Sequence, residues 1–149
     1  MVTIGHSASD VCAQNLLCTS CFNAEVARQH GLENFENIRL KPISLADCLG
    51  TEHQFHFTTR LLGDIVSLEA FELRDGNPAG YCFQQIGNSD DEVFSLLGQL
   101  IQKIRKALSV RHIEEGDLSL RIVDSTVRGR IDWDETSGSL SPLIVVDGE

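Results

Sequence analysis

The chain of 149 residues lacks any apolar run close to the roughly 20 residues that a membrane-spanning helix needs. Its first ten residues contain neither a basic segment nor a continuous apolar segment, so we expect no secretory signal and a cytoplasmic location. Positive charge is also scarce, because 12 Lys and Arg stand against 22 Asp and Glu, for a net charge of -10. This charge repels a phosphate backbone, so we expect neither nucleic acid nor a membrane as a partner.

Motifs of the well-known enzyme classes are missing as well. No phosphate-binding loop is present, because Gly76, Gly80 and Gly87 stand where turns are expected. Neither Gly-x-Ser-x-Gly nor His-Glu-x-x-His occurs. The motifs therefore assign no activity, and they leave open whether the protein is an enzyme.

What is present predicts a globular α+β protein, since 42% of residues are hydrophobic and 23% are charged. A short helix is expected at residues 22–30. Alternating patterns predict strands at residues 53–60, 65–73 and 80–87, and an edge strand at 38–45 that bends at Pro42. We divide the chain into an N-terminal Cys-containing helical segment, residues 1–34, and an α+β domain, residues 35–149.

A long amphipathic helix is predicted at about residues 90–110, packed on one face of an antiparallel sheet. Ser89 is the expected cap, with Glu92 bonding back to it. The apolar stripe that should face the sheet consists of Val93, Leu97, Leu100, Ile101, Ile104 and Leu108. The basic residues from Lys103 to His112 complement the helix dipole at its C-terminal end. Beyond the helix, residues 118–123 and 127–133 are predicted to form a hairpin with one apolar face, followed by a strand at 143–146.

Five cysteines is an odd number, which favours reduced thiols or metal ligands over a disulfide framework. Cys18-Thr-Ser-Cys21 before a helix is half of a zinc knuckle. The two further ligands would have to be His6 and Cys12, whose spacing is not that of a second knuckle. We therefore expect no cofactor, with zinc as the alternative. A redox pair is less favoured, because no strand of a thioredoxin-like unit precedes it.

The strands at residues 53–73 hold the best candidates for catalysis. His56 and Arg60 share one face of the first strand, and Glu69 or Glu72 comes from the next strand. A histidine near a carboxylate can act as a general base, and an arginine can clamp a carboxylate or phosphate. The same residues are also typical of a solvated sheet face. His53 lies an odd number of residues from His56, so the two histidines should point to opposite faces.

A second polar stripe contains Arg128, Arg130 and Asp132. It is interpreted either as a contact for an anionic ligand, as a subunit interface, or as a solvated face on which arginine and aspartate pair.

Five segments resemble a family of uncharacterised bacterial proteins: Cys-Phe-Asn-Ala-Glu, Phe-His-Phe-Thr-Thr-Arg-Leu, Ser-Leu-Glu-Ala-Phe-Glu, Gly-Tyr-Cys-Phe-Gln and Arg-Gly-Arg-Ile-Asp-Trp-Asp. The resemblance covers residues 18–149 and implies a zinc-ribbon-like N-terminus ahead of an α+β domain. This chain departs from the pattern in lacking the first Cys pair of such a ribbon. The family also implies a C-terminal extension; if it is missing here, the face that it would cover is free for a second subunit.

We expect a homodimer on this basis. The favoured function is a non-catalytic binding or interaction module with a small-molecule or protein ligand. The alternatives are a small enzyme that uses His56 with Glu69 or Glu72, and a zinc-binding accessory module.

Overall fold

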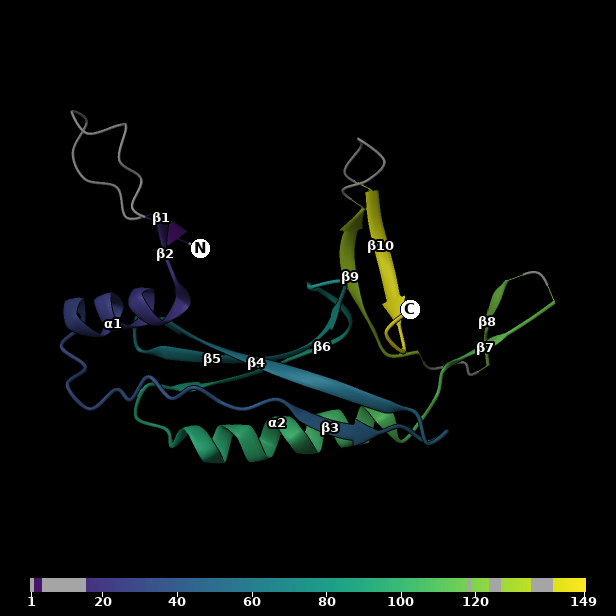
Figure 1. Cartoon of the computed structure of the whole chain (residues 1–149), viewed down its shortest axis with the longest axis horizontal. Helices are drawn as coiled ribbons and strands as arrows, with labels where there is room; N and C mark the ends of the chain where they lie inside the picture. The colour runs from purple at the N-terminus through teal and green to yellow at the C-terminus, as the bar shows by residue number, and fades with distance from the viewer. Residues whose placement is uncertain (1, 4–15, 118, 124–126, 135–140) are drawn as a thin grey trace.

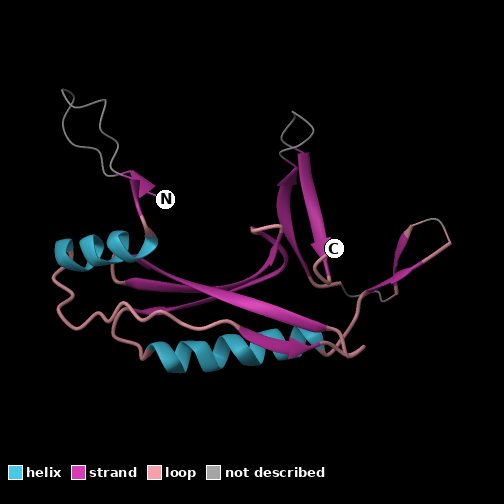
Figure 2. Cartoon of the chain, viewed as in Figure 1, coloured by secondary structure: helices cyan, strands magenta, loops and turns pink. Residues whose placement is uncertain are grey.

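The computed structural model describes residues 2–3, 16–117, 119–123, 127–134 and 141–149. Its centre is a four-stranded antiparallel sheet in the order β3-β4-β5-β6, with strands Ile43–Ala46, Glu52–Leu62, Ile65–Arg74 and Asn77–Asn88. Helix α2 (Val93–Leu108) covers one face of the sheet, and helix α1 (Thr19–Gln29) lies beside β4 (Figure 1). The predicted α+β class with an antiparallel sheet is thereby confirmed (Figure 2).

The core lies between the sheet and α2, because strand alternation places apolar side chains on the face that the helix covers. The buried residues are Phe55, Leu61, Val66, Leu68 and Ala70 from the sheet and Leu96, Leu100, Ile104 and Leu108 from α2. Three predicted members of the helical stripe are only partly buried, while Leu96 replaces Leu97 as a fully buried residue. Among the described residues, neither helix is long and apolar enough to cross a membrane.

The predicted start of α2 at Ser89 is wrong. The helix begins at Val93, and its cap residue Glu92 makes no side-chain capping hydrogen bond. Strand β6 continues to Asn88 instead, and the backbone N–H of Ser89 donates to the carbonyl oxygen of Asp64 at 2.8 Å. Pairing with β5 extends β6 to Asn88, beyond the strand that its sequence pattern predicts. Ser89 is therefore bonded to the end of the sheet and does not cap α2.

The predicted hairpin between residues 118–123 and 127–133 is also wrong. β8 (Leu120–Ile122) pairs with β7 (Ile113–Glu115), and β9 (Gly129–Asp134) pairs with β10 (Ser141–Val146). Each pair is a separate two-stranded sheet that projects beyond the central sheet (Figure 1). β7 was missed because three residues are too few to show an alternating pattern.

Helix α1 is fixed to the edge of β4 by one buried side chain. β3 begins at Ile43, after Pro42, and pairs only with the first part of β4, up to Phe55. Farther along the same edge, the Asn23 side chain donates to the carbonyl oxygen of Thr59 at 2.7 Å and accepts from the N–H of Leu61 at 2.8 Å. Asn23 thus takes the place of a neighbouring strand and is only 1% exposed. Before α1, the short strand β1 (Val2–Thr3) pairs with β2 (Leu16–Leu17).

Candidate ligand-binding site

A cavity of about 210 Å³ lies between β6, the C-terminal half of α2 and the β9–β10 hairpin. Three cationic residues line this basic cavity, Lys103 from α2, Arg130 from β9 and Arg128 just before β9, and Asp147 is the acidic residue beside them. The chain as a whole carries a net charge of -10, so the local charge around this cavity has the opposite sign. The rings of Tyr81 and Phe83 supply an aromatic wall, since they stack with centroids 5.8 Å apart and planes inclined by 12°.

Arg130 has an unusual environment within the basic cavity. Its Nη2 atom forms an ion pair with Oδ2 of Asp132 at 3.1 Å, whereas its Nε atom is buried and has no hydrogen-bond partner among the described residues. Buried N–H donors are almost always paired, and an unpaired donor costs about 1–3 kcal/mol. The guanidinium geometry suits the oxygens of a carboxylate or a phosphate. Because Nε has almost no accessible surface, an anionic ligand in the cavity would contact Arg130 through the other guanidinium nitrogens.

The hairpin is held at the cavity by the residues that follow β10. The Asp147 carboxylate accepts hydrogen bonds from the backbone N–H groups of His112 and Ile113 and lies 2.9 Å from Nδ1 of His112. Gly148 has a φ of +82° and packs closely on Tyr81. A Cβ atom added to Gly148 would lie only 3.1 Å from the backbone nitrogen of Tyr81. These contacts close one side of the basic cavity with backbone.

A compact polar cluster lies next to Tyr81, at the end of the sheet face that α2 covers. Glu72 lies 2.7 Å from Nδ1 of His53 and also accepts from the N–H of Tyr81 at 2.8 Å. Oδ2 of Asp47 lies 3.4 Å from the other nitrogen of His53. Burial, and then the nearby carboxylates of Asp147 and Asp47, raise the pKa of Tyr81 to about 12. This network ties β3, β4, β5 and β6 together at the point where the β5–β6 register shifts.

The geometry therefore pairs Glu72 with His53 rather than with His56. His56, Arg60 and Glu69 lie on the opposite face of the sheet, where they stand across from Phe71, Ser67 and Thr58, respectively. The His56 ring stacks on Phe71 with centroids 6.2 Å apart. Among the described residues, no hydrogen bond joins His56 to Glu69. The enzyme hypothesis gains no assembled acid–base pair on this face.

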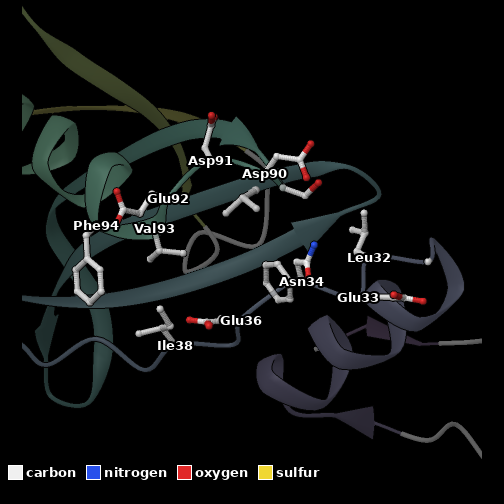
Figure 3. A pocket seen from close by; sticks show the side chains of 14 residues that line it. Leu32, Glu33, Asn34, Glu36, Ile38, Asp90, Asp91, Glu92, Val93 and Phe94 are labelled. Carbon is white, nitrogen blue, oxygen red and sulfur yellow. The ribbon is translucent and has the colours of Figure 1, made fainter.

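An acidic groove of about 660 Å³, larger than the basic cavity, lies between the residues after α1 and the start of α2. Figure 3 shows Glu33 and Glu36 on one side of the groove and Asp90, Asp91 and Glu92 on the other. The Asp91 carboxylate accepts from the N–H of Asn88 at 2.7 Å. Carboxylates before a helix also stabilise its N-terminal dipole, so the cluster does not by itself indicate a ligand.

The two cysteines of the Cys-x-x-Cys segment lie at the start of α1. Cys18 is the cap residue, and its Sγ atom lies 3.2 Å from Sγ of Cys21. The backbone N–H of Cys21 holds the pKa of the Cys18 thiol below its usual range, and the hydrogen bond with Cys18 raises the pKa of Cys21. Both thiols are exposed.

A zinc site would receive two of its four ligands from this pair. Among the described residues, no group of three or more His, Cys, Asp and Glu side chains is arranged to hold a metal ion. The other two candidate ligands, His6 and Cys12, lie outside the described residues.

The structure adds residues to the predicted stripe of Arg128, Arg130 and Asp132. Lys103 and His112 were assigned only to the dipole of the helix, yet both line the basic cavity. The Lys103 ammonium donates to the carbonyl oxygen of Gln84 at 2.6 Å, so it is fixed against β6. The cluster of basic residues from Lys103 to His112 was the sequence signal for an anion site. The sequence does not show, however, that the fold places this cluster beside Arg128 and Arg130.

Residues 36–109 match the family model of a domain of unknown function, DUF7686. The match ends directly after α2, and residues 112–149 match a second domain of unknown function, DUF7713. No curated protein and no solved structure matches the chain. The prediction of an uncharacterised family is therefore confirmed. The DUF7686 segment contributes Tyr81 and Lys103 to the basic cavity and the DUF7713 segment contributes Arg128 and Arg130, so the cavity lies between the two.

Proposed function

We propose that the protein is a non-catalytic binding module that holds a small organic anion in the basic cavity. The observation that carries the proposal is the guanidinium of Arg130 in the cavity lining, a cationic group whose Nε donor has no partner among the described residues. Lys103 and Arg128 make the surrounding potential favourable for a carboxylate or phosphate. The stacked rings of Tyr81 and Phe83 favour a ligand with a flat apolar part.

The position of the basic cavity supports the same function. Ligand sites occur preferentially where two structural units meet, and this cavity lies between the segments that match two families. Two groups that could move protons there are already engaged, because the Lys103 ammonium donates to Gln84 and Nδ1 of His112 lies against Asp147. Binding therefore explains the arrangement without a catalytic step.

The test is thermal unfolding in the presence of benzoate, phenyl phosphate or inorganic phosphate, with benzylamine as a cation of similar shape. An anion at about 100 times its Kd should stabilise the protein by about 2.7 kcal/mol, whereas benzylamine should have no effect. Arg130→Met and Lys103→Gln should reduce the stabilisation. Arg105→Gln should not, because this exposed residue of α2 lies outside the cavity lining. No stabilisation by any of the anions, or an equal effect in Arg130→Met, would refute the proposal.

A second function, self-association, is favoured by the outer face of the β9–β10 hairpin. Ile131 and Ile144 are cross-strand partners and are each 75% exposed, and Trp133 beside them is 57% exposed. The charged side chains of Arg130 and Asp132 point to the other face of the hairpin. An uncharged apolar patch of this kind is complementary to itself across a two-fold axis, which favours a second copy as its partner.

The dimer should be weak and dependent on concentration. A standard interface uses roughly 20–30 residues on each side, far more than this patch offers. Ile144→Ser should weaken association measured by sedimentation velocity, while Leu143→Ser, on the opposite face of the same strand, should not. Added salt should strengthen the dimer by screening the charge of -10 on each copy. A monomer at every protein and salt concentration would contradict self-association.

A further inference from the structure

The exposed thiols of Cys18 and Cys21 are arranged for disulfide chemistry. Their Sγ atoms lie 3.2 Å apart, so a shift of roughly 1 Å brings them to the S–S bond length. Helix α1, which contains Cys21 and has Cys18 as its cap residue, is fixed to the sheet by the bonds of Asn23 to Thr59 and Leu61. The pair therefore sits on a rigid element. The sequence alone disfavoured a redox pair, but the short distance between the sulfur atoms reverses that preference.

A groove of about 200 Å³ lies beside Cys18 and gives a second thiol compound room to approach. One wall of this thiol groove is formed by Cys18 and Ser20 at the start of α1. Thr58 and Thr59 of β4 and Arg39 also line the groove, together with the apolar residues Ile38, Leu40 and Phe57. Hydroxyl groups and one cation suit a small peptide-like molecule that carries carboxylates.

The other exposed cysteines of the described chain differ in one respect. Cys48 and Cys82 each lack a second thiol within hydrogen-bond distance among the described residues. Exchange at either one would stop at a mixed disulfide. Among the described cysteines, only Cys18 and Cys21 have a neighbouring thiol that can resolve such an intermediate.

We propose that Cys18 and Cys21 form a reversible disulfide by exchange with small anionic disulfides of the glutathione class, which bind in the thiol groove. The Cys18 thiolate attacks one sulfur of the oxidised compound, forming a mixed disulfide and releasing one thiolate. Cys21 loses its proton to solvent and attacks Sγ of Cys18, which releases the second thiolate. The protein dithiol is oxidised by two electrons, the small disulfide is reduced to two thiols, and excess thiol reverses both steps.

The test uses the full chain in a background in which Cys12, Cys48 and Cys82 are replaced by serine. After anaerobic incubation with oxidised glutathione, peptide mass mapping should find a Cys18–Cys21 disulfide and no retained glutathione. Cys21→Ser should trap glutathione on Cys18, whereas Cys18→Ser should prevent the internal disulfide. Circular dichroism checks that each variant remains folded, which is expected because both thiols are exposed.

The role of the thiol groove is tested with Arg39→Gln and with two oxidants of opposite charge. The variant should slow trapping of oxidised glutathione on Cys18 by roughly two- to fivefold, the effect of one exposed ion pair. Its reaction with cystamine, a cationic disulfide, should not slow. Equal slowing with both oxidants would refute a binding role for the groove.

Two outcomes would overturn the disulfide itself. One is a pair that stays reduced in excess oxidised glutathione. The other is stoichiometric zinc in protein purified without chelator, bound so that the thiols react only after the metal is removed, because the pair would then be a metal site.

Discussion

Replacing Arg130 by methionine should raise the stability of the ligand-free protein while removing its response to anions. Methionine keeps an unbranched apolar stem and removes the buried Nε donor that has no partner among the described residues. Removing an unsatisfied buried donor should add about 1–3 kcal/mol to the free energy of unfolding. The change also removes the ion pair with Asp132, which is partly exposed and contributes about 0.2–1 kcal/mol.

Subtracting the lost ion pair from the gain at the Nε donor leaves a rise of about 1 kcal/mol in the free energy of unfolding, and the smallest expected change is about zero. For a chain of 149 residues this corresponds to a rise of roughly 2–4 °C in Tm. Urea unfolding followed by circular dichroism measures the free energy, and a repeat with phenyl phosphate measures the loss of ligand stabilisation. Arg128→Met is the matched control, since this exposed side chain should change stability by less than about 0.5 kcal/mol. A loss of more than 1 kcal/mol in Arg130→Met would refute the reasoning, because it would mean that Arg130 stabilises the empty fold.

Three further predictions concern residues that stabilise the central sheet and its contacts. Asn23→Ala should lower the free energy of unfolding by about 2–4 kcal/mol in urea titrations, because it leaves the backbone groups of Thr59 and Leu61 unpaired. Tyr81 is the only tyrosine, so tyrosinate absorbance should titrate near pH 12 in the folded protein and near 10 when unfolded. The stability linked to this raised pKa is complete below pH 10 and is lost as the pH rises through about 12. Burial acts to raise the pKa of Asp47, but the N–H groups of Thr51 and Leu49 and the nearby His53 lower it overall. Asp47→Asn should therefore destabilise the protein at pH 7, and the difference from wild type should vanish on acidification below the normal aspartate range.

The parts of the fold that follow from local patterns could be predicted from the sequence. The apolar period of α2 and the alternation of β4 and β5 depend only on neighbouring residues, so the helix, the strands and the buried face of Phe55 were correct. The start of α2 at Val93 and the pairing of β7 with β8 depend on which segments meet in space. No local pattern contains that information.

The candidate site shows the same division. Arg128 and Arg130 were identified as a possible anion contact from the alternation of residues 127–133 alone. Their association with Lys103 depends on the packing of the hairpin against α2, and the burial of one arginine nitrogen depends on atomic detail. Likewise, Glu72 was recognised as half of a histidine–carboxylate pair, but the face on which it lies selects His53 as its partner.

The most direct test of the binding account is nuclear magnetic resonance of the arginine Nε–H groups during titration with phenyl phosphate. We expect a saturable shift of the Arg130 Nε–H signal as the anion binds the guanidinium, with no shift at the exposed Arg105. Saturation should occur at the same concentrations that stabilise the protein against unfolding. An Arg130 signal that stays in place, or that moves in parallel with Arg105, would contradict the assignment of this cavity as the ligand site.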